Sequence, residues 1–179
     1  MSTSTPRVAL ITGAGTGIGK AAARALLGAG YQIVLSGRNL DKLEKAIKDI
    51  GGNDDNCLAV TCDVGNPASV KDMFAQLKAK FGRIDLLFNN AGTFTTATPA
   101  EDIKYEDWMN VVNTNLTGPF HTIKAVLPHM RSEAWGRIIN ISSVGGIQGS
   151  VKFAGLSAYS SSKGALTILT ECLAERSEE

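Results

Sequence analysis

The chain has 179 residues, of which 44% are apolar and 20% charged, and it carries 18 basic and 17 acidic side chains. This composition predicts one globular domain, residues 1–179, with enough chain to bury a core. It excludes intrinsic disorder, which needs low hydrophobicity and a high net charge. The net charge of +1 provides no basic surface for nucleic acid or for an anionic membrane, so neither is an expected partner.

The N-terminus and the cysteines are typical of a cytoplasmic protein. The first ten residues contain no apolar run long enough for a signal peptide or a membrane span. Cys57, Cys62 and Cys172 are too few for a disulfide framework. Cys57 and Cys62 have neither metal-ligand spacing nor a nearby His, so we expect reduced, buried thiols and no metal site.

The first half of the chain contains two strand–helix units. The apolar run 8–12 predicts a strand that ends in glycines, and apolar residues at helical spacing predict a helix over 17–29. Residues 32–36 predict the second strand. Apolar residues on one face predict a second helix over 40–50, which Gly51-Gly52 ends.

The second half continues this alternation. A strand is predicted at 57–62 and a helix at 67–81, with Asn66 as the N-cap and Pro67 at the first helical position. The elements predicted after them are a strand at 84–88, a helix at 102–130, a strand at 137–142 and a helix at 158–174.

Strand–helix alternation predicts βαβ units and therefore a mainly parallel sheet. The strands are apolar along their whole length, which is typical of strands buried on both faces. We therefore predict a doubly wound α/β fold, Rossmann-like, with three α/β/α layers and strand order 3-2-1-4-5. The ligand is expected at the carboxyl ends of the strands. The fifth strand forms an open edge that invites pairing with another chain, so a homo-oligomer, a dimer or tetramer, is expected.

A glycine-rich loop, Thr12-Gly-Ala-Gly-Thr-Gly-Ile-Gly19, joins the first strand to the first helix. Glycines permit positive φ and bring bare backbone close to a ligand, and the helix N-terminus offers N–H groups to a pyrophosphate. The spacing differs from both G-x-G-x-x-G and the Walker A loop. In this context we favour dinucleotide binding over a tight packing turn. The expected contacts are Gly13, Thr16, Gly17, Ile18 and Gly19.

The end of the second strand indicates which dinucleotide binds. NAD sites usually carry an acidic residue there, and NADP sites a basic residue nearby. Gly37 occupies the acidic position and Arg38 follows it, whereas Asp41 is expected in the first turn of the next helix. This pattern favours NADP, with NAD as the second choice. The alternative for Arg38 is a solvated loop residue.

Tyr159 and Lys163 are four residues apart at the start of the last predicted helix, so they share one face. A tyrosine hydroxyl, with a pKa of about 10, is a poor acid–base group at neutral pH. A neighbouring ammonium lowers that pKa and allows the hydroxyl to exchange a proton with a substrate oxygen. A Tyr-x3-Lys pair alone is common and is usually a surface feature.

The order of these motifs resembles the short-chain dehydrogenase/reductase family. Between the glycine loop and Tyr159-x3-Lys163 lie Asn89-Asn-Ala-Gly92, Asn115 and Ser143. The resemblance runs from about Arg7 to the last residue. Family members normally continue with a further strand, a Pro-Gly loop and a substrate lid, so this chain looks C-terminally truncated. The stretch Val151-Lys-Phe153 lengthens the approach to Tyr159 and is expected to shape the substrate mouth.

The resemblance implies roles for the residues at the reacting centre. Tyr159 would be the catalytic acid/base, and Lys163 would bind the nicotinamide ribose and lower the pKa of Tyr159. Ser143 would hydrogen-bond the substrate oxygen, with Ser142 as a structural neighbour.

The resemblance also implies contacts around the cofactor. Asn115, rather than Asn113, would hold a helix distortion and a water that links Lys163 to solvent. The implied cofactor contacts are the Asp63 side chain and the Val64 N–H at the adenine, and Asn90, Ala91 and Gly92 at the adenosine ribose.

These roles imply an NADP-dependent oxidoreductase that moves a hydride between nicotinamide and a small-molecule carbonyl or alcohol. Two alternatives remain: a non-catalytic dinucleotide-binding or interaction module, and a glycine loop that binds an adenosyl sulfonium, which residues 89–92 and Tyr159-x3-Lys163 disfavour. Without a lid to exclude water, the 179-residue chain is expected to be a poor enzyme by itself. His121 and His129 are expected to be structural.

Overall fold

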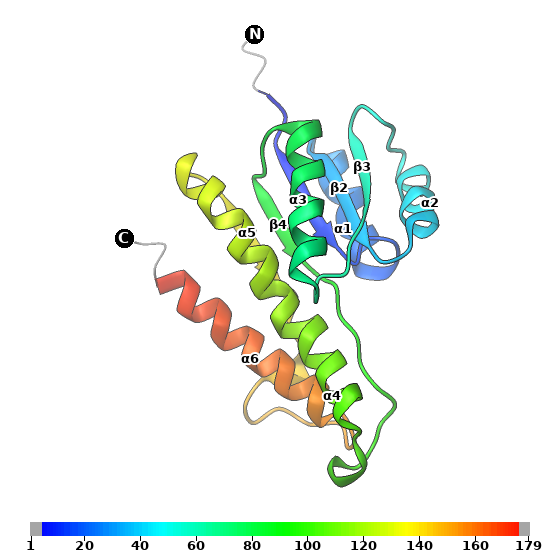
Figure 1. The fold of residues 1–179 in the computed structure, drawn as a ribbon, viewed down its shortest axis with the longest axis vertical. Coiled ribbons are helices and arrows are strands. Elements are labelled where there is room, and N and C mark those ends of the chain that lie inside the picture. Colours follow the sequence, from blue (N-terminus) through cyan, green and yellow to red (C-terminus); the bar gives the residue numbers. More distant parts are fainter. Residues whose placement is uncertain (1–4, 176–179) are drawn as a thin grey trace.

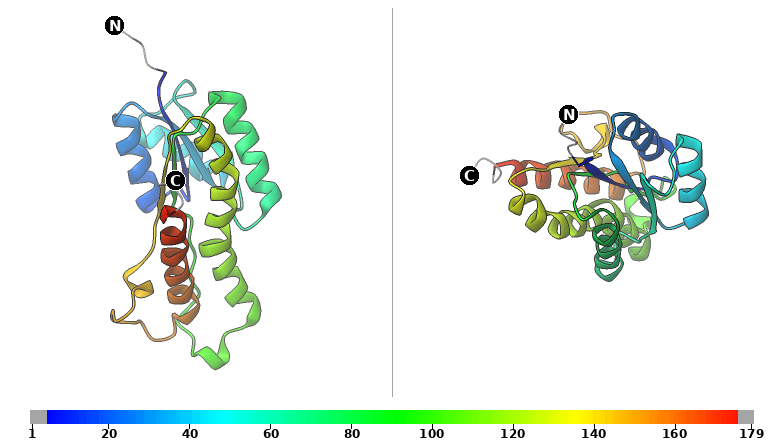
Figure 2. Two further views of the ribbon diagram at one scale, coloured as in Figure 1. Left: turned by 90° about the vertical axis from the view of Figure 1, so that its left-hand side faces the viewer. Right: turned by 90° about the horizontal axis from the view of Figure 1, so that it is seen from above.

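The structure, a computed structural model, describes residues 5–175. These residues form one parallel sheet with helices on both faces (Figures 1 and 2). The strands lie in the order β3-β2-β1-β4-β5 and are β1 (Val8–Thr12), β2 (Gln32–Gly37), β3 (Cys57–Thr61), β4 (Leu86–Asn89) and β5 (Arg137–Asn140). Both the doubly wound α/β fold and the strand order agree with the sequence prediction.

The helices form two layers (Figure 2). On one face of the sheet lie α1 (Gly17–Gly28) and α2 (Leu40–Ile50). On the other lie α3 (Pro67–Phe81) and α5 (Gly118–Ser132), with α6 (Ser157–Ala174) beside α5. The last residues of the predicted domain, 176–179, lie outside the described residues.

The central strand β1 separates two apolar cores. Ala9 and Ile11 pack with side chains of α1 and α2, and Val8 and Leu10 pack with side chains of α3 and α5. All of β1 is buried, as its continuous apolar character predicts. The sheet is therefore held from both sides along its centre.

Polar caps and glycines set the ends of α2 and α3. The side chain of Asn39 accepts the Lys42 N–H at the start of α2, and Asn66 caps α3 in the same way. Gly51 (φ +79°) and Gly82 (φ +75°) follow the last turns of these helices in the left-handed conformation that favours glycine. Local chemistry therefore explains why both helices have the predicted bounds.

The helix predicted over residues 102–130 is wrong as one continuous α-helix. Residues 100–102 form a separate 3₁₀ turn, and α4 spans Tyr105–Val112. A π-helical turn, η2 (Asn113–Thr117), then joins α4 to α5. A Cβ on Gly118, just after this turn, would lie 2.6 Å from Val64 Cγ2, so α5 approaches the end of β3 very closely. Tertiary contacts of this kind interrupt the α-helix at residues 113–117. The apolar period of the sequence does not report them.

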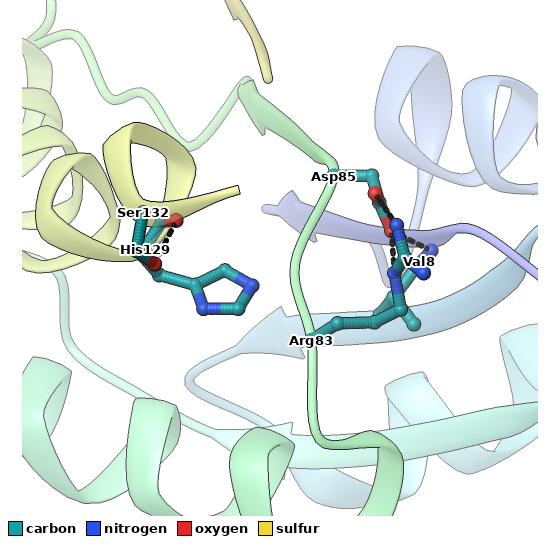
Figure 3. Close-up of polar contacts among 5 residues, drawn as sticks. All are labelled: Val8, Arg83, Asp85, His129 and Ser132. Carbon is teal, nitrogen blue, oxygen red and sulfur yellow. Dashed lines mark hydrogen bonds and ion pairs between the residues drawn. The ribbon is translucent and has the colours of Figure 1, made fainter. Parts of the chain in front are cut away.

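The strand predicted at 84–88 begins two residues later, at Leu86. Asp85 is 3% exposed, and its Oδ2 accepts the Val8 N–H at 2.8 Å and the Arg83 Nε–H at 2.8 Å (Figure 3). The carboxylate therefore accepts a hydrogen bond from the buried Val8 N–H of β1, at a point where β4 has not yet begun to pair with β1. The same carboxylate raises the pKa of the Arg83 guanidinium.

Strand β5 forms the open edge of the sheet, as predicted, but it is not buried on both faces. Ile139, paired in register with Phe88 of β4, is 40% exposed, and Arg137 is exposed as well. Helices α1 and α2 do not cover β5 on their side of the sheet. Burial on both faces, predicted from the apolar sequence of β5, is therefore wrong for this strand.

Candidate active site

The glycine loop turns from β1 into α1 with its backbone bare. Gly13 (φ +65°) and Gly17 (φ +54°) adopt the left-handed conformation. A Cβ on Gly19 would lie 2.5 Å from the Gly13 carbonyl oxygen, so position 19 needs glycine because a side chain would clash with the loop backbone. The first turn of α1 carries no acidic residue, and Thr16 stands at the N-cap without capping α1 through its side chain. The exposed N-terminus of α1 can therefore receive an anion.

Thr12 joins this loop to the segment after β4, a role that sequence reasoning missed. Its buried Oγ1 accepts the N–H groups of Asn90 and Ala91, both at 3.0 Å. The Asn90 amide in turn donates to the carbonyls of Thr12 and Gly13 at 3.0 and 3.2 Å. Asn90 and Ala91 therefore stabilise the loop from behind. The presence of Thr12 in the glycine motif does not by itself predict these hydrogen bonds.

The end of β2 carries the basic group that was predicted to select the cofactor. Arg38 is exposed directly after β2, at the same edge of the sheet as the glycine loop. Asp41 lies in the first turn of α2, as predicted. A Cβ on Gly15 would lie 3.3 Å from Lys42 Cβ, so the start of α2 contacts the glycine loop directly. Arg38 therefore precedes a helix start that contacts the glycine loop.

Asp63 and Val64 follow β3 at the same edge. Asp63 is exposed, and its Oδ1 accepts the Gly65 N–H at 3.0 Å. Val64 is buried against Gly118, and its carbonyl lies 3.0 Å from Nδ1 of His121. His121, expected to be structural, thus contacts the peptide that follows the Val64 N–H, one predicted adenine contact. This link depends on the π-helical turn, so helical periodicity could not find it.

Tyr159 lies in the first turn of α6, half-buried and facing Phe94. The two rings meet edge to face, with centroids 6.3 Å apart. Phe94 belongs to the segment that follows residues 89–92, so α6 brings Tyr159 to the carboxyl end of β4. The contact with Phe94 therefore holds the Tyr159 ring near the edge where the cofactor is expected.

Lys163 is buried beside this tyrosine. Its side chain is 4% exposed, and Nζ donates to the Ile141 carbonyl at 2.7 Å and lies 5.9 Å from the centroid of the Tyr159 ring. Burial lowers the pKa of the Lys163 ammonium, because desolvation disfavours the charged form. The predicted shared face of Tyr159 and Lys163 is present. A buried ammonium with one carbonyl partner is costly, which is typical of a functional group.

Asn115 lies in the π-helical turn η2 and is fully buried. Its Oδ1 accepts the Thr93 N–H at 2.8 Å, and its Nδ2 donates to the Thr93 carbonyl and to Ser162 Oγ at 2.9 and 3.1 Å. The helix distortion expected at Asn115 is present, whereas Asn113 is exposed. Ser162, buried one residue before Lys163, is a second positioning residue that the sequence did not reveal.

The two serines after β5 have different surroundings. Ser142 Oγ bonds to the Lys163 carbonyl and to Thr167 Oγ1, both at 2.9 Å, which is a structural role. Ser143 Oγ accepts the Gly145 N–H at 3.2 Å. That bond uses the Ser143 oxygen as acceptor, so its hydroxyl hydrogen can still be donated to a ligand.

Gly92 is where several predicted residues meet. A Cβ on Gly92 would lie 3.5 Å from Asn115 Oδ1 and 3.7 Å from Lys163 Nζ. Apart from Tyr159 and Lys163 on α6, the predicted cofactor contacts follow β1, β2, β3 or β4, at the edge where a doubly wound sheet binds its ligand. The exposed Ile18, in the first turn of α1, belongs to the same edge. Among residues 5–175, no group of three or more His, Cys, Asp or Glu side chains could hold a metal ion.

Comparison with known proteins identifies the family. A family profile described as "short chain dehydrogenase" matches residues 7–179. The chain belongs to the short-chain dehydrogenase family. A 3-oxoacyl-[acyl-carrier-protein] reductase of Synechocystis is 38% identical over 176 residues, which cover 98% of this chain and 70% of that protein.

Two solved structures of the family carry different cofactors. A metagenomic short-chain oxidoreductase in complex with NADP has a TM-score of 0.87 and 34% identity, over 95% of this chain and 76% of that one. An NAD+-bound xylitol dehydrogenase has a TM-score of 0.86 and 36% identity, over 96% of this chain and 65% of that one. The short-chain dehydrogenase chain described here thus spans about two thirds of the length of such relatives.

Proposed function

We propose that this short-chain dehydrogenase transfers a hydride between a nicotinamide dinucleotide and a small-molecule carbonyl or alcohol, with Tyr159 as the acid/base. The observation that carries the proposal is the buried Lys163 ammonium beside the Tyr159 ring, next to Gly92 and Asn115. A cation next to a phenol favours the phenolate and brings the hydroxyl pKa closer to neutral.

The residues at the carboxyl edge of the sheet fit a dinucleotide. The bare glycine loop and the N-terminus of α1 suit a pyrophosphate. The nicotinamide would supply or accept the hydride. In the reducing direction Tyr159 would give its hydroxyl proton to the substrate oxygen, and Ser143 would hydrogen-bond the same oxygen. Lys163 would hold the ribose, and Asn115 would hold a water that links Lys163 to solvent.

NADP is the cofactor that we propose, with NAD as the second choice. The support is the exposed Arg38, which follows Gly37 where an NAD site would carry an acidic residue. A guanidinium can pair with the additional 2′-phosphate of NADP, and NAD lacks that group.

The decisive test is NADPH consumption with a panel of ketones, aldehydes, sugars and acyl-thioester ketones. Carbonyl-dependent loss of NADPH absorbance is expected, together with weaker activity from NADH. If NADPH binds but no carbonyl is reduced, the alternative of a non-catalytic dinucleotide-binding module gains support.

Because the chain spans about two thirds of the length of its relatives, the assay should include a second form of the protein. This form carries the additional C-terminal segment of a longer relative. The sequence predicts higher turnover in the longer form, and equal turnover would contradict that prediction.

We also propose self-association and a cytoplasmic location. The unpaired edge of β5, with Ile139 exposed beside it, supports a dimer or tetramer built through strand pairing. The free, buried thiols of Cys57 and Cys62 suit a reducing compartment. Within residues 5–175, no helix has both the length and the apolar character for a membrane span. Light scattering over a concentration series tests the oligomer, and a monomer at all concentrations would contradict it.

A further inference from the structure

Two segments border Tyr159 and form what we call the mouth: residues 93–99 after β4 and residues 143–156 after β5. Phe94 of the first packs edge to face on Tyr159. In the second, a Cβ on Gly145 would lie 3.1 Å from the side chain of Ser160, the residue after Tyr159. The Thr98 N–H donates to the Gly155 carbonyl at 3.1 Å and joins the two segments. A substrate that reaches the Tyr159 hydroxyl must therefore pass along the mouth.

The large side chains of the mouth are apolar and exposed. Phe94, Val144, Ile147, Val151 and Phe153 are 70%, 65%, 54%, 82% and 64% exposed. Such a concentration of exposed apolar side chains costs solubility and marks a place that receives an apolar partner. Because Phe94 packs on Tyr159 and the second segment reaches Ser160, the apolar partner that the position favours is a part of the substrate.

Besides small hydroxyl side chains and Gln148, the mouth offers few groups to a charged or polyhydroxylated substrate. Residues 93–99 and 143–156 contain one charged residue, Lys152. Its ammonium donates to the Ile147 carbonyl and, at 2.7 Å, to Ser150 Oγ, so it is engaged within its own loop. The Thr98 hydroxyl likewise donates locally, to the Thr96 carbonyl at 2.9 Å. Recognition of a polyol needs several convergent polar side chains, because a buried hydroxyl without a partner is costly.

We propose that the substrate is a ketone or secondary alcohol whose reacting carbon bears an apolar chain or ring, rather than a sugar or polyol. The inference rests on the proposed oxidoreductase function and deepens it. Phe94, Ile147 and Phe153 would contact the apolar part, while Tyr159 and Ser143 meet the oxygen. Oxidation of the alcohol passes its hydride to the oxidised nicotinamide and its hydroxyl proton to Tyr159.

The test uses the oxidation of 2-propanol, 2-butanol, 2-hexanol and 2-octanol, with xylitol as the polyol probe. Each methylene that enters an apolar mouth is expected to raise kcat/KM about fourfold until the mouth is filled. Xylitol should be the poorest substrate. A flat series, or xylitol as good as 2-hexanol, would overturn the proposal.

Paired variants connect this selectivity to the mouth. Phe94→Ala should lower kcat/KM for 2-octanol by roughly tenfold or more and lower that for 2-propanol much less, because the larger alcohol loses its apolar contact. Ile168→Ala, at a position on α6 that is 58% exposed outside the mouth, should change neither value. Equal loss for both alcohols in Phe94→Ala would contradict recognition of the apolar chain by the mouth.

A binding measurement separates the inference from the proposed function. Saturation-transfer NMR with the same alcohols reports binding whether or not any of them is oxidised. If nothing is turned over but 2-octanol binds in preference to xylitol, and Phe94→Ala weakens that binding, the apolar mouth stands and the proposed reaction fails. If neither alcohol binds preferentially, the apolar mouth is wrong.

Discussion

The two halves of the sheet differ in what holds them together. Strands β1, β2 and β3, with their helices, use local signals: apolar runs, Asn caps and glycine C-caps. Strands β4 and β5 lead into segments held by long-range polar contacts, such as Asn115 with Thr93 and Lys163 with Ile141. In the proposed function the first half binds the cofactor, whereas the second half carries the reacting groups on contacts that a single substitution can remove.

The largest effect is expected in the second half, from Tyr159→Phe. The ring and its contact with Phe94 remain, and only the hydroxyl is lost. Turnover should fall about 10²–10⁴-fold, the usual contribution of an acid/base group, while the Kd for NADPH stays nearly unchanged. Parallel assays of turnover and NADPH fluorescence check this. Near-normal turnover would mean that another group handles the proton.

The next effect tests cofactor binding by the first half through Arg38→Ala. A charge-assisted bond to phosphate contributes about 1.5–3 kcal/mol, so the Kd for NADPH should rise roughly ten- to a hundredfold. The Kd for NADH, which lacks the 2′-phosphate, should stay the same. Titration of both reduced cofactors into both proteins measures this. Equal affinity of the wild type for the two cofactors is the outcome that refutes the role of Arg38.

A smaller effect is expected from Gly19→Ala, which tests the packing of the glycine loop. The new methyl group would lie 2.5 Å from the Gly13 carbonyl oxygen and 2.7 Å from Asn90 Nδ2. Overpacking of this kind costs about 1–3 kcal/mol of unfolding free energy. The matched control is Gly28→Ala in the same helix, where a Cβ meets nothing within 4 Å. Denaturant unfolding should separate the two variants, and equal stability would contradict the close contact.

The smallest effect concerns the pH dependence of stability at Lys163. Burial lowers the pKa of Lys163 from its ordinary value of 10.5. Between the lowered pKa and 10.5 the unfolded chain binds more protons than the folded chain, so the wild type gains stability as pH rises through this window. Lys163→Met should lack this gain and should also lose activity.

Unfolding free energies at several alkaline pH values test this difference. Lys124→Met, at an exposed position of α5, is the control and should parallel the wild type. Parallel curves for the wild type and Lys163→Met would contradict the burial of a charged ammonium.

The sequence alone determined the alternation of strands and helices, the bounds of α2 and α3, and the set of motifs at the carboxyl edge. These features depend on period, capping and glycine chemistry, which act over a few neighbouring residues. The resemblance then assigned roles to Tyr159, Lys163, Ser143 and Asn115, and the fold brings Lys163 to Tyr159 and to Asn115 through Gly92.

Only the tertiary structure decided the π-helical turn at Asn115, the late start of β4 at Leu86 and the bond between Thr12 and Asn90. It also decided that the apolar strand β5 is exposed along one face. Each of these depends on side chains that meet across at least 20 residues of chain, or on which face a helix happens to cover. The hydrophobic period of a segment predicts its secondary structure and its buried face. It contains no information about which distant group will contact that segment.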